Sequence, residues 1–292
     1  MKFKISFLLF LILIFVFLPF TSKAAEQTTI AKLIQQIEII KFEIAVFQSL
    51  ISNLQLNQGI TAKSYLAVDL SNNSVLLQKN SNQTYIPASI TKLMTAVITL
   101  ENTNENQTIT LTEKMLEPAG QSPCLFLGLN ISAKNLLKAS LTQSANDAAE
   151  ALSYFTGKEK FIGLMNQKAK ELNMLNTVFH DVHGLNPANK TTASDLLKLL
   201  SYIQKNHPEI LSTSKENDFW LPDASGTLLK FQNVNNFYPL PEFIGGKTGY
   251  LPEAKQTLAS MFNVNGKQIA IILLYSSNRQ ADAFAIIKQI RK

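Results

Sequence analysis

Three short motifs supply the residues of this 292-residue chain that are best suited to catalysis. The first motif pairs Ser89 with Lys92. A spacing of three places both side chains on one face of a helix, about one turn apart, so the amine can reach the hydroxyl. Because a serine hydroxyl is a poor nucleophile until a base takes its proton, this pair predicts a serine nucleophile with a lysine base.

Ser89 also has a rival interpretation as an ordinary helix N-cap serine. The Ser-x-x-Lys pattern is common, and the chain holds a second copy from Ser212 to Lys215, in a polar run at 212–218 that we expect to be a solvated loop. A function for Ser89 is favoured by its position after Pro87, at the start of an apolar helix. Free backbone N–H groups at a helix start help to hold an oxyanion.

The second motif joins Ser144 to Asn146. It lies between two stretches with helical periodicity, 135–141 and 148–152. A polar turn between packed helices can direct a hydroxyl and an amide into a cleft. The alternative is again a capping serine, since the Ser-x-Asn pattern also occurs elsewhere in the chain.

The third motif, Lys247, Thr248 and Gly249, occurs once. A phosphate-binding loop would need a glycine at position 241, where the chain has Pro241, and a helix directly after the motif. The residues that follow have a strand pattern instead, so a nucleotide site is excluded. Two glycines before the lysine favour a sheet edge where the backbone of a substrate can come close.

In this order the three motifs resemble those of the penicillin-recognising serine hydrolases. Within that group, residues 62–292 are similar to the D-alanyl-D-alanine carboxypeptidase family of low-molecular-mass penicillin-binding proteins. The stretches that carry this resemblance are residues 87–96, 144–149, 165–172, 183–186, 192–195 and 246–250.

The resemblance implies a site without metal or cofactor, in which Ser89 attacks the terminal D-Ala-D-Ala bond. It assigns catalytic roles to Ser89, Lys92 and Ser144, and substrate-binding roles to Asn146, Lys247, Thr248, Gly249, Tyr250 and Arg279. Lys92 and Ser144 would move protons, and Asn146 would orient the substrate and Lys92. The cationic side chains of Lys247 and Arg279, together with Thr248, would receive the substrate carboxylate. The oxyanion would be held by the backbone N–H groups of Ser89 and Tyr250.

Lys92 can act as a base only when its amine is neutral. A free lysine has a pKa of about 10.4, and lowering that pKa by about 3 costs roughly 4 kcal/mol. Burial and a neighbouring cation can supply such a change, and Lys247 is the candidate for the cation.

The predicted function is therefore an exported serine D-Ala-D-Ala carboxypeptidase that trims peptidoglycan stem peptides and binds β-lactam antibiotics covalently. A DD-endopeptidase or transpeptidase acting on peptidoglycan remains an alternative, because the motifs do not decide what accepts the acyl group. A non-catalytic cell-wall-binding protein is the alternative from another class. Efficient β-lactam hydrolysis is not expected, because Ala169 stands where a class A β-lactamase would have its deacylating glutamate.

The elements that must position these residues begin after an export leader. Residues 1–24 combine Lys2 and Lys4, an apolar run, and the small residues Ser22 and Ala24, the order of a signal peptide. If it is not cleaved, the same segment would anchor the protein in the membrane with its body on the outer face. We therefore expect an extracytoplasmic protein, either released or held at the cytoplasmic membrane.

The sequence predicts one helix at residues 25–60, because apolar residues recur at steps of three and four between positions 30 and 54. Two interpretations of this heptad-like pattern are open. The helix packs along the body of the protein, or it forms a stalk that makes a homodimer through residues 30–54.

Residues 61–292 predict a catalytic domain of the α+β class. A β-hairpin is expected at 64–79, and strands at 226–232, 242–248, 256–264 and 267–275. Helices are expected at 87–100 and 281–291, with a helical subdomain at about 112–225. The resemblance makes this a β-lactamase/DD-peptidase-like fold, an antiparallel sheet flanked by helices, with the helical subdomain inserted and an N-terminal helix added.

Composition excludes several other classes. The formal charge of +6 includes three lysines of the leader, and the chain has two arginines and no basic stripe, so we expect no nucleic acid partner. One cysteine, Cys124, cannot form an intrachain disulfide and is expected to be a buried apolar residue. His180 and His183 have a metal-like spacing, but Gly184 and Pro187 predict a loop there.

Overall fold

The computed structural model describes Leu33, Gln36 and residues 59–292, apart from positions 121, 123 and 223–226. The chain divides into two compact units, Met1–Asn57 and Gln58–Lys292. The predicted leader at 1–24 and nearly all of the predicted helix at 25–60 lie outside the described residues, although Leu33 and Gln36 are both helical. Among the helices that are described, none has the length and hydrophobicity needed to cross a bilayer.

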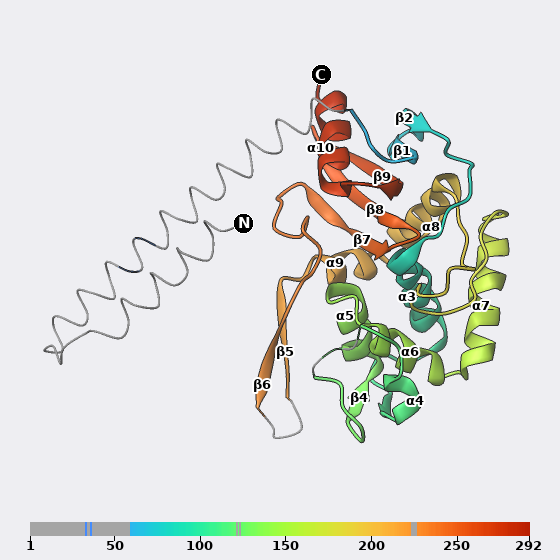
Figure 1. Cartoon of the computed structure of the whole chain (residues 1–292), viewed down its shortest axis with the longest axis vertical. Coiled ribbons are helices and arrows are strands. Elements are labelled where there is room, and N and C mark those ends of the chain that lie inside the picture. The colour runs from blue at the N-terminus through green and yellow to red at the C-terminus, as the bar shows by residue number, and fades with distance from the viewer. Residues whose placement is uncertain (1–32, 34–35, 37–58, 121, 123, 223–226) are drawn as a thin grey trace, which may run out of the picture. The chain divides into compact units, whose positions relative to one another are not determined.

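The second unit is built on a five-stranded antiparallel sheet in the order β2-β1-β9-β8-β7. A hairpin from the start of the unit pairs, through β1, with the last of three consecutive strands from its end, so the sheet unites segments far apart in the sequence (Figure 1). As the third motif predicted, β7 is an edge strand. The strands are β1 (Ser64–Asp69), β2 (Ser74–Lys79), β7 (Phe243–Leu251), β8 (Lys255–Val264) and β9 (Lys267–Ser276).

Helices and two short two-stranded sheets occupy the chain between β2 and β7, and one helix follows β9. The helices are η1 (Ala88–Ile90), α3 (Thr91–Asn102), α4 (Glu113–Leu116), α5 (Ala133–Thr142), α6 (Asn146–Tyr154), α7 (Lys158–Glu171), α8 (Ala193–Asn206), α9 (Pro208–Lys215) and α10 (Arg279–Ile290). The short sheets pair β3 (Thr108–Thr110) with β4 (Asn130–Ser132), and β5 (Asp218–Pro222) with β6 (Leu228–Gln232). This arrangement confirms the predicted α+β class.

The sheet separates two hydrophobic cores. Alternate residues of a strand point to opposite faces, so β9 contributes Ala270, Ile272 and Leu274 to one core and Ile269, Ile271 and Leu273 to the other. The second core is covered by α10 through Ala283, Ile286 and Ile287. The first core is larger and contains α3.

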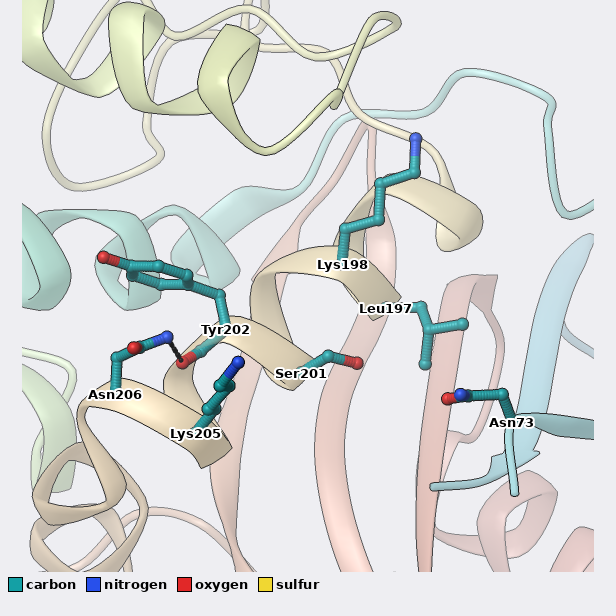
Figure 2. A pocket seen from close by; sticks show the side chains of 7 residues that line it. All are labelled: Asn73, Leu197, Lys198, Ser201, Tyr202, Lys205 and Asn206. Carbon is teal, nitrogen blue, oxygen red and sulfur yellow. Dashed lines mark hydrogen bonds between the residues drawn. The ribbon is translucent and has the colours of Figure 1, made fainter. Parts of the chain in front are cut away.

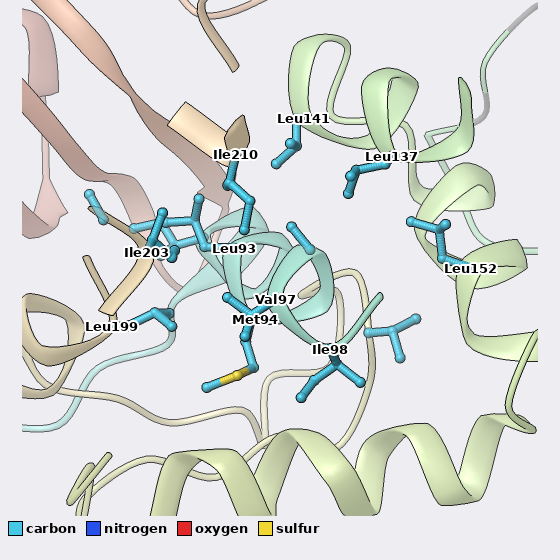
Figure 3. Close-up of a cluster of buried hydrophobic side chains, with 14 of the residues drawn as sticks. Leu93, Met94, Val97, Ile98, Leu137, Leu141, Leu152, Leu199, Ile203 and Ile210 are labelled. Atoms are coloured by element: carbon cyan, nitrogen blue, oxygen red, sulfur yellow. The ribbon is translucent and has the colours of Figure 1, made fainter. Parts of the chain in front are cut away.

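Helix α3 is surrounded by other helices and by the sheet (Figure 3). Figure 3 shows its residues Leu93, Met94, Val97 and Ile98 facing side chains from α5, α6, α8 and α9, among them Leu137, Leu141, Leu152, Leu199, Ile203 and Ile210. Residues Thr91 to Thr99 of α3 are all buried, so this helix belongs to the interior. Because Lys92 lies in the first turn of α3 and Ser89 directly before it, the core fixes the chain on which the first motif is built.

The polar run at 212–218 is not the solvated loop that its composition predicted. Residues Ser212 to Lys215 form the last turn of α9, and Ser214 is fully buried. The Ser214 hydroxyl donates to the carbonyl of Leu211 at 2.7 Å and accepts the backbone N–H of Gly246 at 2.8 Å. This polar stretch therefore includes Ser214, which connects α9 to β7, the strand of the third motif.

The aromatic cluster of the second core gives a test of the fold. Phe262 lies 5.5 Å from both Phe237 and Phe243, measured between ring centroids, and is fully buried. We expect Phe262→Ala to lower the free energy of unfolding by about 3–5 kcal/mol, measured by urea denaturation. The control Val75→Ala removes a side chain that is 53% exposed and should change it by less than about 0.5 kcal/mol. Equal effects of the two substitutions would show that this cluster does not stabilise the sheet.

Candidate active site

Ser89 lies in the short helix η1, immediately before α3, and is half-buried. The preceding residue, Ala88, has a φ of 52°, which is unusual for a residue with a side chain. Two glycines approach this backbone closely. A Cβ on Gly184 would lie 2.0 Å from the Ala88 carbonyl oxygen, and one on Gly249 would lie 2.8 Å from the Ser89 nitrogen. Glycine at both positions thus lets two distant segments touch the chain at Ser89.

The Lys92 amine is fully buried and contacts three oxygen atoms. Its Nζ lies 3.1 Å from the Oγ of Ser89, 2.6 Å from the Oδ1 of Asn146 and 2.8 Å from the backbone carbonyl oxygen of His183. A neutral amine would donate its two hydrogens to Asn146 and His183 and keep its lone pair for the Ser89 hydroxyl. The geometry therefore suits a base that takes a proton from Ser89.

The surroundings of Lys92 also favour the neutral amine. Burial, followed by repulsion from the Lys247 ammonium, holds the pKa of Lys92 well below its usual range. The carboxylates of Asp181 and Asp147 act in the opposite direction and raise this pKa. Lys247 is thus the nearby cation that the sequence predicted, although burial has the larger effect.

Asn146 and Ser144 lie where α5 turns into α6. Asn146 is the first residue of α6, and its Nδ2 donates to the carbonyl of Ala119 at 2.5 Å, which directs its Oδ1 toward Lys92. Ser144 has a φ of 60° and is half-buried in the turn. Within the described part of the chain its hydroxyl forms no hydrogen bond. The structure therefore brings Asn146 into direct contact with Lys92. Ser144 precedes Asn146 by two positions in the sequence.

Lys247 and Thr248 lie on the edge strand β7 and are 1% and 5% exposed. Burial and then repulsion from Arg279 lower the pKa of Lys247 to about 7. Arg279, the first residue of α10, donates from Nη1 to the carbonyl of Gly249 at 3.0 Å. Neither cation has an acidic partner among the residues that the structure describes. Two such cations side by side are suited to bind an anionic group such as a carboxylate.

Tyr250 follows directly after Gly249 and its side chain is 60% exposed. Its backbone N–H is one of the two donors assigned to the oxyanion by resemblance. The close approach of Gly249 to the nitrogen of Ser89 brings the two segments with these donors together. That both N–H groups hold an oxyanion remains a prediction.

Two acidic residues that act on Lys92 were given no role from the sequence. Asp147 is fully buried and accepts the backbone N–H groups of Ser122 and Ala148, both at 2.8 Å. Burial raises the pKa of Asp147 to about 6 in spite of these bonds. The second is Asp181, in the loop whose His183 carbonyl accepts from Lys92. Their signal in the sequence was their place within or beside stretches that carry the family resemblance.

Other sequence predictions concern residues outside this site. Cys124 is buried, as predicted. His180 and His183 lie in a loop, and the described residues contain no group of three or more acidic, histidine or cysteine side chains that could hold a metal. A groove of about 650 Å³ lies on α8, and none of the predicted site residues lines it (Figure 2). It is lined by Asn73, Leu197, Lys198, Ser201, Tyr202, Lys205 and Asn206.

Residues 51–278 match the model of peptidase family S11, described as D-alanyl-D-alanine carboxypeptidase. The chain therefore belongs to this family, as the motifs and their arrangement indicated.

The curated relatives include proteins named D-alanyl-D-alanine endopeptidase and proteins named D-alanyl-D-alanine carboxypeptidase. The chain is 35% identical over 229 residues to a D-alanyl-D-alanine endopeptidase of Haemophilus influenzae, covering 76% of this chain and 77% of the relative. It is 31% identical over 286 residues to a D-alanyl-D-alanine endopeptidase of Escherichia coli, covering 94% and 83%. It is 30% identical over 240 residues to the D-alanyl-D-alanine carboxypeptidase DacF of Bacillus subtilis, covering 76% and 59%.

Solved structures show the same fold. A mutant of a Streptomyces DD-transpeptidase superposes with a TM-score of 0.72 at 28% identity, covering 79% of this chain and 97% of that chain. A D-alanyl-D-alanine carboxypeptidase of Mycobacterium tuberculosis superposes with a TM-score of 0.73 at 24% identity, covering 79% and 90%. These similarities confirm the predicted DD-peptidase-like fold.

Because Lys247 is buried, we expect its charged form to lower the stability of the folded protein by an amount that depends on pH. The pKa of Lys247 is about 7 in the folded chain, below the ordinary lysine value of 10.5. Below pH 7 the lysine is charged in both the folded and the unfolded chain, so folding carries the full cost of burying the charge. Between about pH 7 and 10.5 the folded chain loses this proton first, and the cost declines as pH rises.

Lys247→Met should therefore stabilise the protein while removing a predicted substrate contact. We expect a gain of up to about 5 kcal/mol near pH 6 that shrinks toward pH 10, measured by urea denaturation at several pH values. Lys288→Met replaces an exposed lysine of α10 and serves as the control, with little change at any pH. A loss of stability in Lys247→Met at low pH would contradict the buried-charge explanation.

Proposed function

We propose that this protein is a serine D-Ala-D-Ala carboxypeptidase that removes the terminal D-alanine of peptidoglycan stem peptides through an acyl-enzyme on Ser89. One observation carries this proposal. The Ser89 hydroxyl lies 3.1 Å from the buried Lys92 amine, whose surroundings favour the neutral form. Membership of the D-alanyl-D-alanine carboxypeptidase family supplies the substrate class.

In the proposed acylation, the Ser89 oxygen attacks the carbonyl carbon of the bond between the two D-alanines while its proton passes to Lys92. The backbone N–H groups of Ser89 and Tyr250 stabilise the negative charge that develops on the carbonyl oxygen. The tetrahedral intermediate then breaks the C–N bond. The leaving amine takes up the proton, with Lys92 and Ser144 as the proposed donors.

The terminal carboxylate of the substrate would lie between Lys247, Thr248 and Arg279. The two cations have no acidic partner among the described residues, so a carboxylate would supply the missing negative charge. Its presence would raise the pKa of Lys247 and keep that amine charged in the complex. Recognition of a free carboxylate next to the reacting bond is what an enzyme that acts at a peptide terminus requires.

Water attacking the acyl-enzyme would release the shortened stem peptide. If the bond that is cut instead joins two stem peptides, the same chemistry gives an endopeptidase. The similarity to the Escherichia coli endopeptidase favours this second candidate, because the match covers 94% of this chain and 83% of the relative, against 59% of the Bacillus subtilis carboxypeptidase. Transfer of the acyl group to an amine would give a transpeptidase.

The proposed location is the outer side of the cytoplasmic membrane, where peptidoglycan lies. This part of the proposal depends on the export leader predicted at 1–24, with membrane attachment through that segment when it is not cleaved. A homodimer through residues 30–54 is likewise a proposal from the sequence pattern. β-Lactam antibiotics would act as covalent ligands of Ser89.

Incubation with a labelled penicillin tests the nucleophile. We expect one covalent adduct, located by mass spectrometry on the peptide that contains Ser89, and no adduct in Ser89→Ala. Ser212→Ala is the matched control, since Ser212 starts the second Ser-x-x-Lys sequence but is exposed on α9. An adduct that persists in Ser89→Ala would exclude Ser89 as the nucleophile.

Digestion of purified muropeptides separates the candidate activities. Release of one D-alanine from monomeric stem peptides is the result expected of a carboxypeptidase. Conversion of dimers to monomers without that release would identify an endopeptidase, and the reverse conversion a transpeptidase. Binding to cell walls without turnover of any D-Ala-D-Ala peptide would favour the non-catalytic alternative.

A further inference from the structure

The loop of residues 181–186 lies against both members of the first motif, although the acyl chemistry above assigns it no role. The carbonyl oxygen of His183 accepts a hydrogen bond from Lys92 at 2.8 Å. The next residue, Gly184, lies against the carbonyl of Ala88, because an added Cβ there would be 2.0 Å from that oxygen. The position of this loop therefore affects the base and the backbone just before the nucleophile.

One carboxylate holds the loop in its shape. Asp181, which is 6% exposed, accepts the backbone N–H of Gly184 at 2.7 Å and that of Asn186 at 2.6 Å. It also accepts the Asn189 side-chain amide at 2.8 Å and lies 3.1 Å from Nδ1 of His183. Burial alone would raise the pKa of Asp181, but the His183 ring and these hydrogen bonds outweigh it and hold the pKa well below its usual range. The carboxylate is therefore charged.

Two further contacts tie the loop to the helices of the site. The Thr95 hydroxyl donates to the Val182 carbonyl at 2.5 Å, and Thr95 stands one turn after Lys92 on α3. On the other side, Nε2 of His183 lies 3.6 Å from Oε2 of the buried Glu150, on the helix that begins with Asn146. The loop thus joins the helix of the base to the helix of Asn146.

We propose that Asp181 is a positioning residue for the acylation step. Its carboxylate shapes the 181–186 loop so that the His183 carbonyl orients the Lys92 amine toward Ser89. Its charge has a second effect, since the ionisable groups around Lys92 are Lys247 on β7, Asp147 on α6, and Asp181 with His183 in the loop. Removing the negative charge of Asp181 leaves the repulsion from Lys247 less opposed. This proposal rests on the proposed function of Ser89 and Lys92.

Asp181→Asn tests the proposal, because asparagine keeps the size of the side chain but loses the charge and one of the two acceptor oxygens. The measurement is the second-order rate of penicillin acylation between about pH 5 and 9. We expect the rate at neutral pH to fall at least about tenfold because the base is misplaced. The limb of the profile that rises as Lys92 loses its proton should move to lower pH, because the carboxylate no longer favours the charged amine.

Asp195→Asn is the matched control. Asp195 is 1% exposed and accepts the backbone N–H of Asn176 at 2.9 Å, so its loss should destabilise the fold in a similar way. It is not among the charges that act on Lys92, and the pH profile of acylation should stay unchanged. An unchanged rate and profile in Asp181→Asn, or the same shift in Asp195→Asn, would overturn the proposal.

Thr95→Val provides a second variant that leaves every charge in place. We expect slower acylation with an unchanged pH profile, since only the bond to Val182 is lost. A wild-type rate in this variant would also count against the role of the loop, and the variant serves as the test if Asp181→Asn does not fold.

Amide hydrogen exchange of Gly184 and Asn186, measured in Asp195→Asn and in either test variant, reports on the loop without any enzymatic activity. Wild-type protein that forms no Ser89 adduct would contradict the proposed function, whereas unchanged exchange in the test variant would contradict the role of the loop.

Discussion

The burial of the Lys92 amine governs both the chemistry and the stability of this site. Lys92 is held by Ser89, Asn146 and the carbonyl of His183, which come from three separate segments of the chain. A charged amine in such a place would lose its hydration, so the surroundings favour its neutral form. The same burial that costs stability lowers the pKa of Lys92, as its proposed role as a base requires. The first core, which holds α3 in place, is needed because an amine on a mobile helix would become hydrated again.

The charge pattern of the site follows from this constraint. The positive charge of Lys247 lowers the pKa of Lys92, and that of Arg279 lowers the pKa of Lys247. Asp147 and Asp181 limit the effect from the other side. A site arranged in this way is less stable when it is empty than when an anionic substrate is bound, which is the usual relation between stability and function at a binding site. Because β7 is an edge strand, one of its sides has no neighbouring strand, and this is where the proposed substrate would bind.

Much of the fold could be predicted from the sequence because it depends on local patterns. The β1-β2 hairpin, the three C-terminal strands and the helix that starts at Ser89 have clear periodicity, and they occur in the structure within a few residues. The polar end of α9 was predicted wrongly, because its helical state depends on burying Ser214 against Gly246, far along the chain. The short strand β5 was not predicted either. It is stabilised mainly by its pairing with β6, and not by a strand pattern in its own residues.

The groups available for the reaction can be read from the sequence alone, because a hydroxyl, an amine or an amide at a given spacing is a local property. The sequence also indicated the family, through three motifs whose order resembles that of the penicillin-recognising serine hydrolases. The surroundings of these groups, in contrast, come from the packing of the folded chain. The contact between Lys92 and the His183 carbonyl joins segments about 90 residues apart in sequence. Burial and the balance of neighbouring charges arise when such segments pack together, and no periodicity in the sequence encodes them.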